Sequence, residues 1–287
     1  MTSAPWSFRR VATTGRAPLT SLGIPFGLSG LAGTWTMAAR TGLATNAIAE
    51  VLWSVAALAW IVVVTNYLWR SGNRGGSVRA DLRDPVQGAF ASLAPTTAML
   101  ICTHYATYLP RSGRIATGLF MVIALLFGAW FLAQLALHER SVDTVHAGYL
   151  LPTFAIFSAP PAVAGNAWFA HNSGQVDLME ILLLGTFVVL IGVQVMMLGA
   201  YVRLRFHLGF WAFTFTAASS GTYAVHWLAL WHGAGHEALA WLTVAIVTAV
   251  IGGIAVRSVG ALLRAHRASR AGTGPIVQAR LKVSSQV

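Results

Sequence analysis

Three histidines and one acid gather at the end of a long apolar segment and could bind a metal ion. His226, His232 and His236 precede Glu237, and imidazole and carboxylate groups are both ligands for zinc. Their spacing matches no metal-binding motif, and histidines between apolar segments usually meet water. We therefore expect no metal site, and the chain has no motif for a cofactor.

The acids beside the apolar segments favour structural roles. Glu50, Glu180 and Glu237 stand near the starts of such segments, where a negative charge complements a helix dipole. Asp177 with Glu180 fits the spacing of a capping box. No carboxylate falls near the middle of an apolar segment, where acids mark proton relays. No nucleophile lies beside a base, so the sequence does not indicate an enzyme.

The composition explains why these polar residues lie between apolar segments. Of 287 residues, 56% are hydrophobic and 9% are charged, which excludes an ordinary soluble domain. The net charge of +11 does not indicate nucleic-acid binding, because no polar domain carries it. Segments long enough to cross a bilayer occur at 20–39, 46–69, 86–108, 113–138, 148–170, 178–202, 208–231 and 237–263.

The pattern predicts an all-α integral membrane protein with about eight transmembrane helices. Residues 1–19 form an N-terminal segment, 20–263 the transmembrane domain and 264–287 a polar tail. Of the 19 lysines and arginines, 16 lie on one side of the predicted membrane and three on the other. The basic side is cytoplasmic by the positive-inside rule. Both termini are therefore expected in the cytoplasm, in a protein of the bacterial inner membrane.

Prolines divide the predicted helices into two kinds. All five prolines within the segments, Pro25, Pro95, Pro152, Pro160 and Pro161, fall on the odd-numbered ones. A proline frees a carbonyl group, which needs protein or a wet cavity beside it. Odd helices are then kinked inner helices, each paired in a hairpin with an apolar outer helix. Alternatively, the small residues of the odd helices serve only close packing, as at Gly23 and Gly27.

Four strings of residues on these helices resemble those of a known family. They are Gly23-Ile24-Pro25-Phe26-Gly27-Leu28, Asp84-Pro85-Val86, Tyr149-Leu150-Leu151-Pro152 and Trp211-Ala212-Phe213-Thr214-Phe215. In order and placement the chain resembles the tellurite-resistance and dicarboxylate transporter family, whose plant relatives are the slow anion channels of guard cells. The resemblance implies inner helices around one pore, a phenylalanine that closes it, and a homo-oligomer, specifically a trimer.

The motif match gives the role of gate to Phe215. Around it the segment is rich in hydroxyl side chains, so the ring would be an apolar plug in a polar lining that blocks and dewets the pore. The alternative is an ordinary packing aromatic. The residues expected to line the pore are Gly23, Pro25, Gly27, Pro95, Thr96, Pro152, Pro160, Pro161, Thr214 and Ser219.

The chain departs from the family in length. The family usually has ten helices in five hairpins, and residues 159–165 already resemble its seventh helix. One hairpin, about 40 residues, is therefore expected to be missing after Thr153. The leading hypothesis is a channel or uniporter for small inorganic or organic acid anions. Alternatives are a proton-coupled C4-dicarboxylate or tellurite-related exporter, and a degenerate relative that transports nothing.

Overall fold

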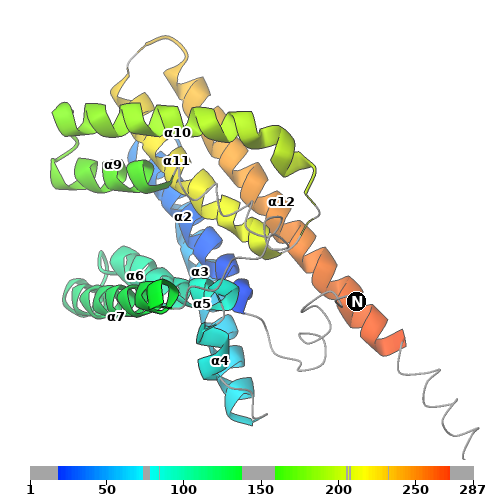
Figure 1. Cartoon of the computed structure of the whole chain (residues 1–287). Helices are drawn as coiled ribbons and strands as arrows, with labels where there is room; N and C mark the ends of the chain where they lie inside the picture. The colour runs from blue at the N-terminus through cyan, green and yellow to red at the C-terminus, as the bar shows by residue number, and fades with distance from the viewer. Residues whose placement is uncertain are drawn as a thin grey trace, which may run out of the picture.

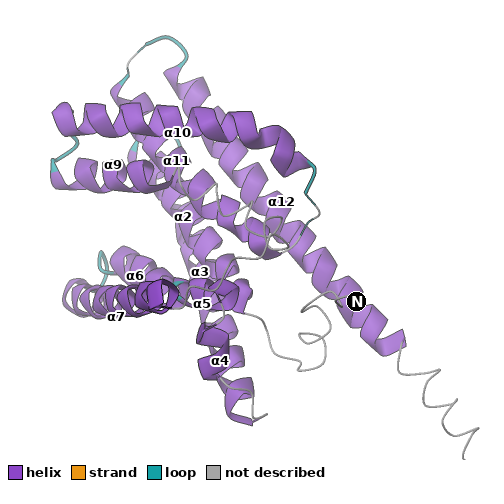
Figure 2. Cartoon of the chain, viewed as in Figure 1, coloured by secondary structure: helices purple, strands orange, loops and turns teal. Residues whose placement is uncertain are grey.

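The computed structural model describes residues 19–73, 78–83, 85–137, 159–204, 206, 208–231 and 233–271. Within these residues every regular element is a helix, and Figure 2 shows helices joined by loops. Most helices pair with the next one along the chain.

The first half of the chain contains two helical hairpins. A short 3-10 helix, η1 (Leu19–Leu22), leads into α2 (Gly23–Arg40), which packs against α3 (Asn46–Asn73). The helices α4 (Val78–Arg83) and α5 (Pro85–Ala91) then lead into α6 (Leu93–Tyr105), which packs against α7 (Pro110–Leu137).

The second half contains two more hairpins. The helix α9 (Ala159–His171) packs against α10 (Leu178–Val202). A short 3-10 helix, η4 (Leu208–Phe210), precedes α11 (Trp211–Leu230), and α11 packs against α12 (His236–Ala271). The predicted tail begins at residue 264, whereas α12 continues to Ala271.

Length and polarity separate the inner and outer helices as the sequence predicts. Within the described residues, the helices long and apolar enough to cross a membrane are α3, α7, α10 and α12, the second members of the four hairpins. In α7 and α10 the most apolar stretch has no buried residue. An outer surface of leucine, valine and methionine suits contact with lipid.

The inner helices α2 and α11 form the centre of the bundle. The helix α2 contacts α3, α6, α11 and α12, and α11 contacts α2, α9 and α12. Figure 1 shows the hairpin of α6 and α7 well apart from that of α9 and α10. Among the described residues, no element pair in substantial contact joins these two hairpins. The described inner helices therefore form an open arc in the order α6, α2, α11, α9.

The third predicted segment is two helices instead of one. The chain is helical through Ala91, interrupted at Ser92, and helical again from Leu93. Pro95 has no N–H group to donate to the carbonyl of Ala91, so the ladder of hydrogen bonds fails there. Before Pro25 the 3-10 helix η1 passes directly into α2 at Gly23, without an interruption. Pro25 and Pro95 both occupy the first turn of the α-helix that contains them.

The remaining three prolines, Pro152, Pro160 and Pro161, belong to the predicted segment 148–170. Of the predicted segment 148–170, the structure describes a helix only from Ala159, with Pro160 and Pro161 in its first turn, where proline is well tolerated. Pro152 lies outside the described residues.

Candidate pore and gate

Small residues allow α2 and α11 to approach closely. A Cβ atom at Gly23 would lie 2.6 Å from Cβ of Trp211, and one at Gly27 would overlap the Thr214 side chain. Thr214 is fully buried, and its hydroxyl donates to the Trp211 carbonyl at 2.7 Å. The structure thus brings Gly23, Gly27 and Thr214 together in one helix contact, as the close-packing alternative proposes.

Phe215, the candidate gate, lies beside this contact. Its ring stacks on Phe26 of α2, with 4.5 Å between ring centroids and 24° between ring planes. Phe26 is buried, whereas Phe215 is partly exposed. On either side in the sequence, Thr214 and Thr216 are buried. An apolar ring pair between two inner helices is therefore flanked by hydroxyl-bearing residues.

The other residues predicted to line the pore are spread over four helices and differ in exposure. Buried positions are Pro25 on α2 and Pro161 on α9, and the more open ones are Pro95, Thr96, Pro160 and Ser219. A hydrogen bond ties Ser219 to another inner helix, because its backbone carbonyl accepts from Asn166 Nδ2 of α9 at 3.1 Å.

Asn166 and His226 form a polar cluster that the sequence did not indicate. Asn166 Nδ2 donates to Ser219, so its Oδ1 is the acceptor facing His226 Nδ1 at 3.0 Å. His226 Nδ1 then carries the hydrogen. The imidazole also stacks on Phe169 of α9, with centroids 4.9 Å apart. His226 is therefore a partner of α9 instead of a member of a loop histidine cluster.

The structure describes one of the other two histidines of the predicted cluster, His236. His236 Nδ1 lies 3.0 Å from the Gly233 carbonyl, and the side chain of His232 lies outside the described residues. In the part of the chain that the structure describes, no three histidine, cysteine or acidic side chains are close enough to hold a metal ion.

A polar cavity of about 520 Å³ opens where α2, α11 and α12 meet, at the end predicted to face outward. Arg40, His236 and Glu237 line it together with Trp241. Arg40 is the last residue of α2 and brings positive charge to the ends of the two central helices. Opposite charges attract, so this cavity could hold an anion near the candidate pathway.

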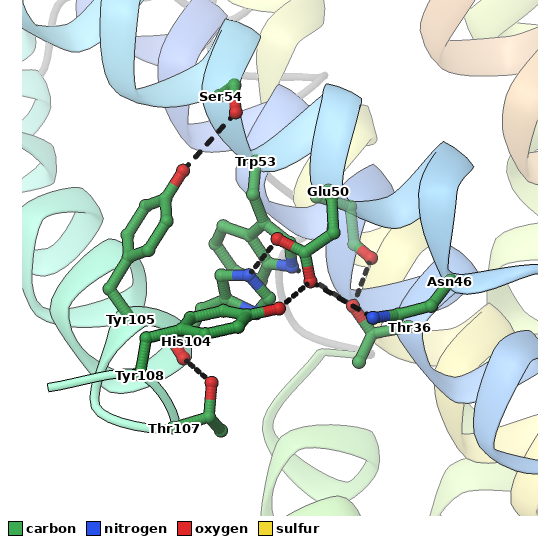
Figure 3. A network of polar contacts seen from close by, with 10 residues as sticks. Thr36, Asn46, Glu50, Trp53, Ser54, His104, Tyr105, Thr107 and Tyr108 are labelled. Atoms are coloured by element: carbon green, nitrogen blue, oxygen red, sulfur yellow. Dashed lines mark hydrogen bonds and ion pairs between the residues drawn. The ribbon is translucent and has the colours of Figure 1, made fainter. Parts of the chain in front are cut away.

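Glu50 organises a second polar network, shown in Figure 3. Tyr108 donates to Oε1 at 2.7 Å, Asn46 donates to the same oxygen at 3.2 Å, and His104 Nε2 lies 3.1 Å from Oε2. The hydrogen bond to Glu50 raises the pKa of the Tyr108 phenol. Glu50 therefore links α3 to the end of α6 in addition to standing near a helix N-terminus.

Aromatic stacking extends this network to α2 (Figure 3). The rings of Trp53 and His104 are parallel within 11°, with centroids 4.6 Å apart. Trp53 Nε1 donates to Thr36 Oγ1 at 3.0 Å. His104 thus lies at the junction of α2, α3 and α6.

Glu180 differs from its predicted structural role. Asp177 caps α10 as expected, because its Oδ1 accepts from the Glu180 amide at 3.1 Å. The Glu180 side chain does not complete the box. It is fully buried and accepts a hydrogen bond from the Tyr223 hydroxyl of α11 at 2.8 Å. Sequence position alone could not reveal this burial, since it depends on the packing of α11.

Comparison with known proteins agrees with this architecture. Residues 16–199 match the family described as SLAC1, voltage-dependent anion channel. The chain is also similar to the tellurite resistance protein TehA homolog of Haemophilus influenzae, with 24% identity over 271 residues that cover 75% of this chain and 82% of the relative. Since 75% of 287 is about 215, about 56 aligned positions of the relative have no counterpart here.

The family match covers more than half of the chain and includes the first three hairpins up to most of α10. SLAC1 proteins are multi-pass helical membrane proteins and are not enzymes. The long apolar outer helices agree with that description. The chain belongs to the SLAC1 family of voltage-dependent anion channels.

Proposed function

We propose that the chain forms a pathway for small anions, inorganic or organic, lined by α2, α6, α9 and α11 and closed by Phe215. The observation that carries the proposal is the stacking of Phe215 on Phe26 between the two central helices. Two apolar rings in a hydroxyl-rich surrounding can exclude water, and a dewetted constriction blocks ions. Membership of an anion-channel family supports the nature of the substrate.

The cavity beside Arg40 supports an entrance for anions at the end of α2 and α11. Few basic residues lie on the side of the membrane predicted to be outside, and Arg40 is one of them. A single cation in a concave polar site raises the local concentration of anions more than an exposed one does. Glu237 also lines the cavity and would limit that effect.

Replacement of the gate residue tests the proposal. Phe215→Ala should increase anion flux into liposomes. It should also lower the free energy of unfolding by less than the truncation of a core aromatic to alanine does, which costs about 3 to 5 kcal/mol. The matched control is Phe213→Ala, two residues earlier on α11, whose ring packs edge-on against Tyr201 of α10 at 4.8 Å. The control should lose thermal stability without gaining flux. Equal behaviour of the two variants would make Phe215 a packing residue.

The proposed orientation places both termini and the loop near Arg70 in the cytoplasm, with the turns near Arg40, Arg111 and His171 outside. The distribution of basic residues supports it. Single cysteines in those turns, on a Cys102→Ala background, should react with an impermeant thiol reagent added to intact cells. Reaction of a cysteine in the Arg70 loop would contradict the orientation.

We also propose that one hairpin of the family's ring is missing between α7 and α9. The open arc of described inner helices and the about 56 unmatched positions of the relative support this, since a hairpin needs about 40 residues. Neighbouring copies would then cover the open side in a homo-oligomer, such as the trimer that the family resemblance implies. The mass of the complex in mild detergent tests that assembly.

Two alternatives have observations of their own. A proton-coupled exporter of C4-dicarboxylates or tellurite-related anions needs a titratable group within the membrane, and buried Glu180 supplies a candidate. A relative that transports nothing is favoured by the incomplete arc. Flux into liposomes with and without a pH gradient separates the three. Of the three hypotheses, only the proton-coupled exporter requires the pH gradient for flux, and only the relative that transports nothing shows no flux in either condition.

A further inference from the structure

Glu180 is fully buried near the start of α10, which packs against α9 and whose side chains reach Tyr223 of α11. Its neighbour Tyr223 belongs to a cluster of apolar side chains that includes Ala162 and Phe169 of α9. The ring of Phe187, two turns along α10, meets Tyr223 edge to face with centroids 5.3 Å apart. The carboxyl group is thus shielded from lipid and water by three helices.

The side-chain hydrogen bond to the carboxyl group comes from Tyr223 of α11. Tyr223 donates to Oε2 at 2.8 Å, whereas Oε1 is buried without a partner. In the described residues no arginine, lysine or histidine forms an ion pair with it. Asp177, at the N-cap of the same helix, places a like charge close to the carboxyl group.

Other titratable groups on the surrounding helices do not compensate a negative charge. Tyr223 of α11 already serves as the donor. One turn farther along α11, His226 bonds to Asn166 of α9. Burial of a charged carboxylate without a cation is costly, and such groups usually become neutral by taking up a proton.

We infer that Glu180 is a proton-binding site in the packed structure, with the proton on Oε1 and the Tyr223 hydroxyl bonded to Oε2. The position near the start of α10, beside the turn at residues 172–177, makes the outer solution the source of the proton. Loss of that proton would set an unpaired charge beside Asp177 and loosen the contact of α10 with α11.

This contact connects the site to the candidate gate. Tyr223 and Phe215 lie on the same helix, about 12 Å apart along its axis at 1.5 Å per residue. An effect on flux rests on the proposed pathway, whereas the proton site itself does not. The two are tested separately below.

Carbodiimide labelling tests the proton site without any measurement of transport. Dicyclohexylcarbodiimide partitions into membranes, where the O–H of a protonated carboxyl group adds across one of its C=N bonds. The resulting O-acylisourea rearranges to a stable N-acylurea. Glu180 should be labelled in liposomes at acid and neutral pH. Above its midpoint, labelling should fall about tenfold for each pH unit, as the protonated fraction does. The readout is the mass of the peptide that contains Glu180.

Glu50 is the internal control, since its side chain is 30% exposed and has several donors. It should stay unlabelled at neutral pH. In Tyr223→Phe, loss of the donor to Oε2 should move the labelling curve of Glu180 to higher pH, which a purely structural role would not do. A recovered peptide with unmodified Glu180 at every pH, or a curve unmoved in Tyr223→Phe, would overturn the inference.

Thermal unfolding provides a second readout. If the folded form holds a proton that the unfolded form releases, stability must fall as pH rises from acid to neutral. Glu180→Gln keeps the shape and has no titratable proton, so its melting temperature should lose that part of the pH dependence. If the melting temperature depended on pH in the same way in the parent and in Glu180→Gln, the result would contradict the proton site. If labelling succeeds and flux is the same in Glu180→Gln at every pH, the site exists but does not act on the pathway.

Discussion

Two glutamates near the N-terminal ends of long apolar helices occupy similar places in the sequence and very different places in the structure. Glu50 is the fifth residue of α3, and Glu180 is the third residue of α10. The Glu50 side chain is 30% exposed and has Asn46, Tyr108 and His104 around it. Glu180 is fully buried, and its carboxyl group accepts a hydrogen bond from Tyr223.

The difference comes from the neighbouring inner helix. Opposite α3, the helix α6 ends at Tyr105. His104 near its end and Tyr108 in the turn that follows bond to the carboxylate at the surface (Figure 3). Opposite α10, the helix α11 continues past Glu180 and covers it with Tyr223 and the cluster around Phe169. An acid at a helix start is thus a surface group or a buried group according to where its neighbour ends.

Charge reversal at the two sites should give the largest contrast. Glu180→Lys places an uncompensated cation in the apolar cluster and should cost about 3 to 5 kcal/mol. Glu50→Lys can direct its ammonium group to water and should remain folded. Yield and melting temperature in detergent compare the two. A stable Glu180→Lys protein with the melting temperature of the parent would show that the site around Glu180 is wet.

Removal of a tyrosine hydroxyl should again destabilise the protein more at the Glu180 site than at the Glu50 site, by a smaller amount than charge reversal does. Tyr223→Phe leaves a buried carboxyl group without its donor, which should cost about 1 to 3 kcal/mol. Tyr108→Phe removes one of several partners from an exposed group, and water can replace it, so the melting temperature should hardly change. Equal losses in the two variants would mean that the two carboxyl groups have similar surroundings.

Much of the fold follows from local sequence. A stretch of about 20 apolar residues has to cross the membrane as a helix, because its backbone groups find no other partners there. For that reason the outer helices α3, α7, α10 and α12 match the predicted segments closely. Inner helices match less well, since Pro95 divides one predicted segment into α5 and α6.

The candidate site could be predicted only in part. The motifs on α2 and α11 singled out Phe26, Gly27 and Phe215 in the sequence, but not that the two rings stack across the helix contact. Gly27 could be a pore residue or a packing residue by its type alone. Its close approach to Thr214 depends on the rotation of both helices, which no local pattern specifies.

By itself the sequence determined that the chain is a helical membrane protein and where the four long apolar helices of its described part lie, because these depend on hydrophobicity along the chain. The partners of the polar side chains were decided only by the tertiary structure. Asn166 meets His226, and Glu180 meets Tyr223, across more than forty residues of chain. Such pairs form when helices distant in sequence pack with one particular rotation, and that rotation results from the fit of all the side chains between them.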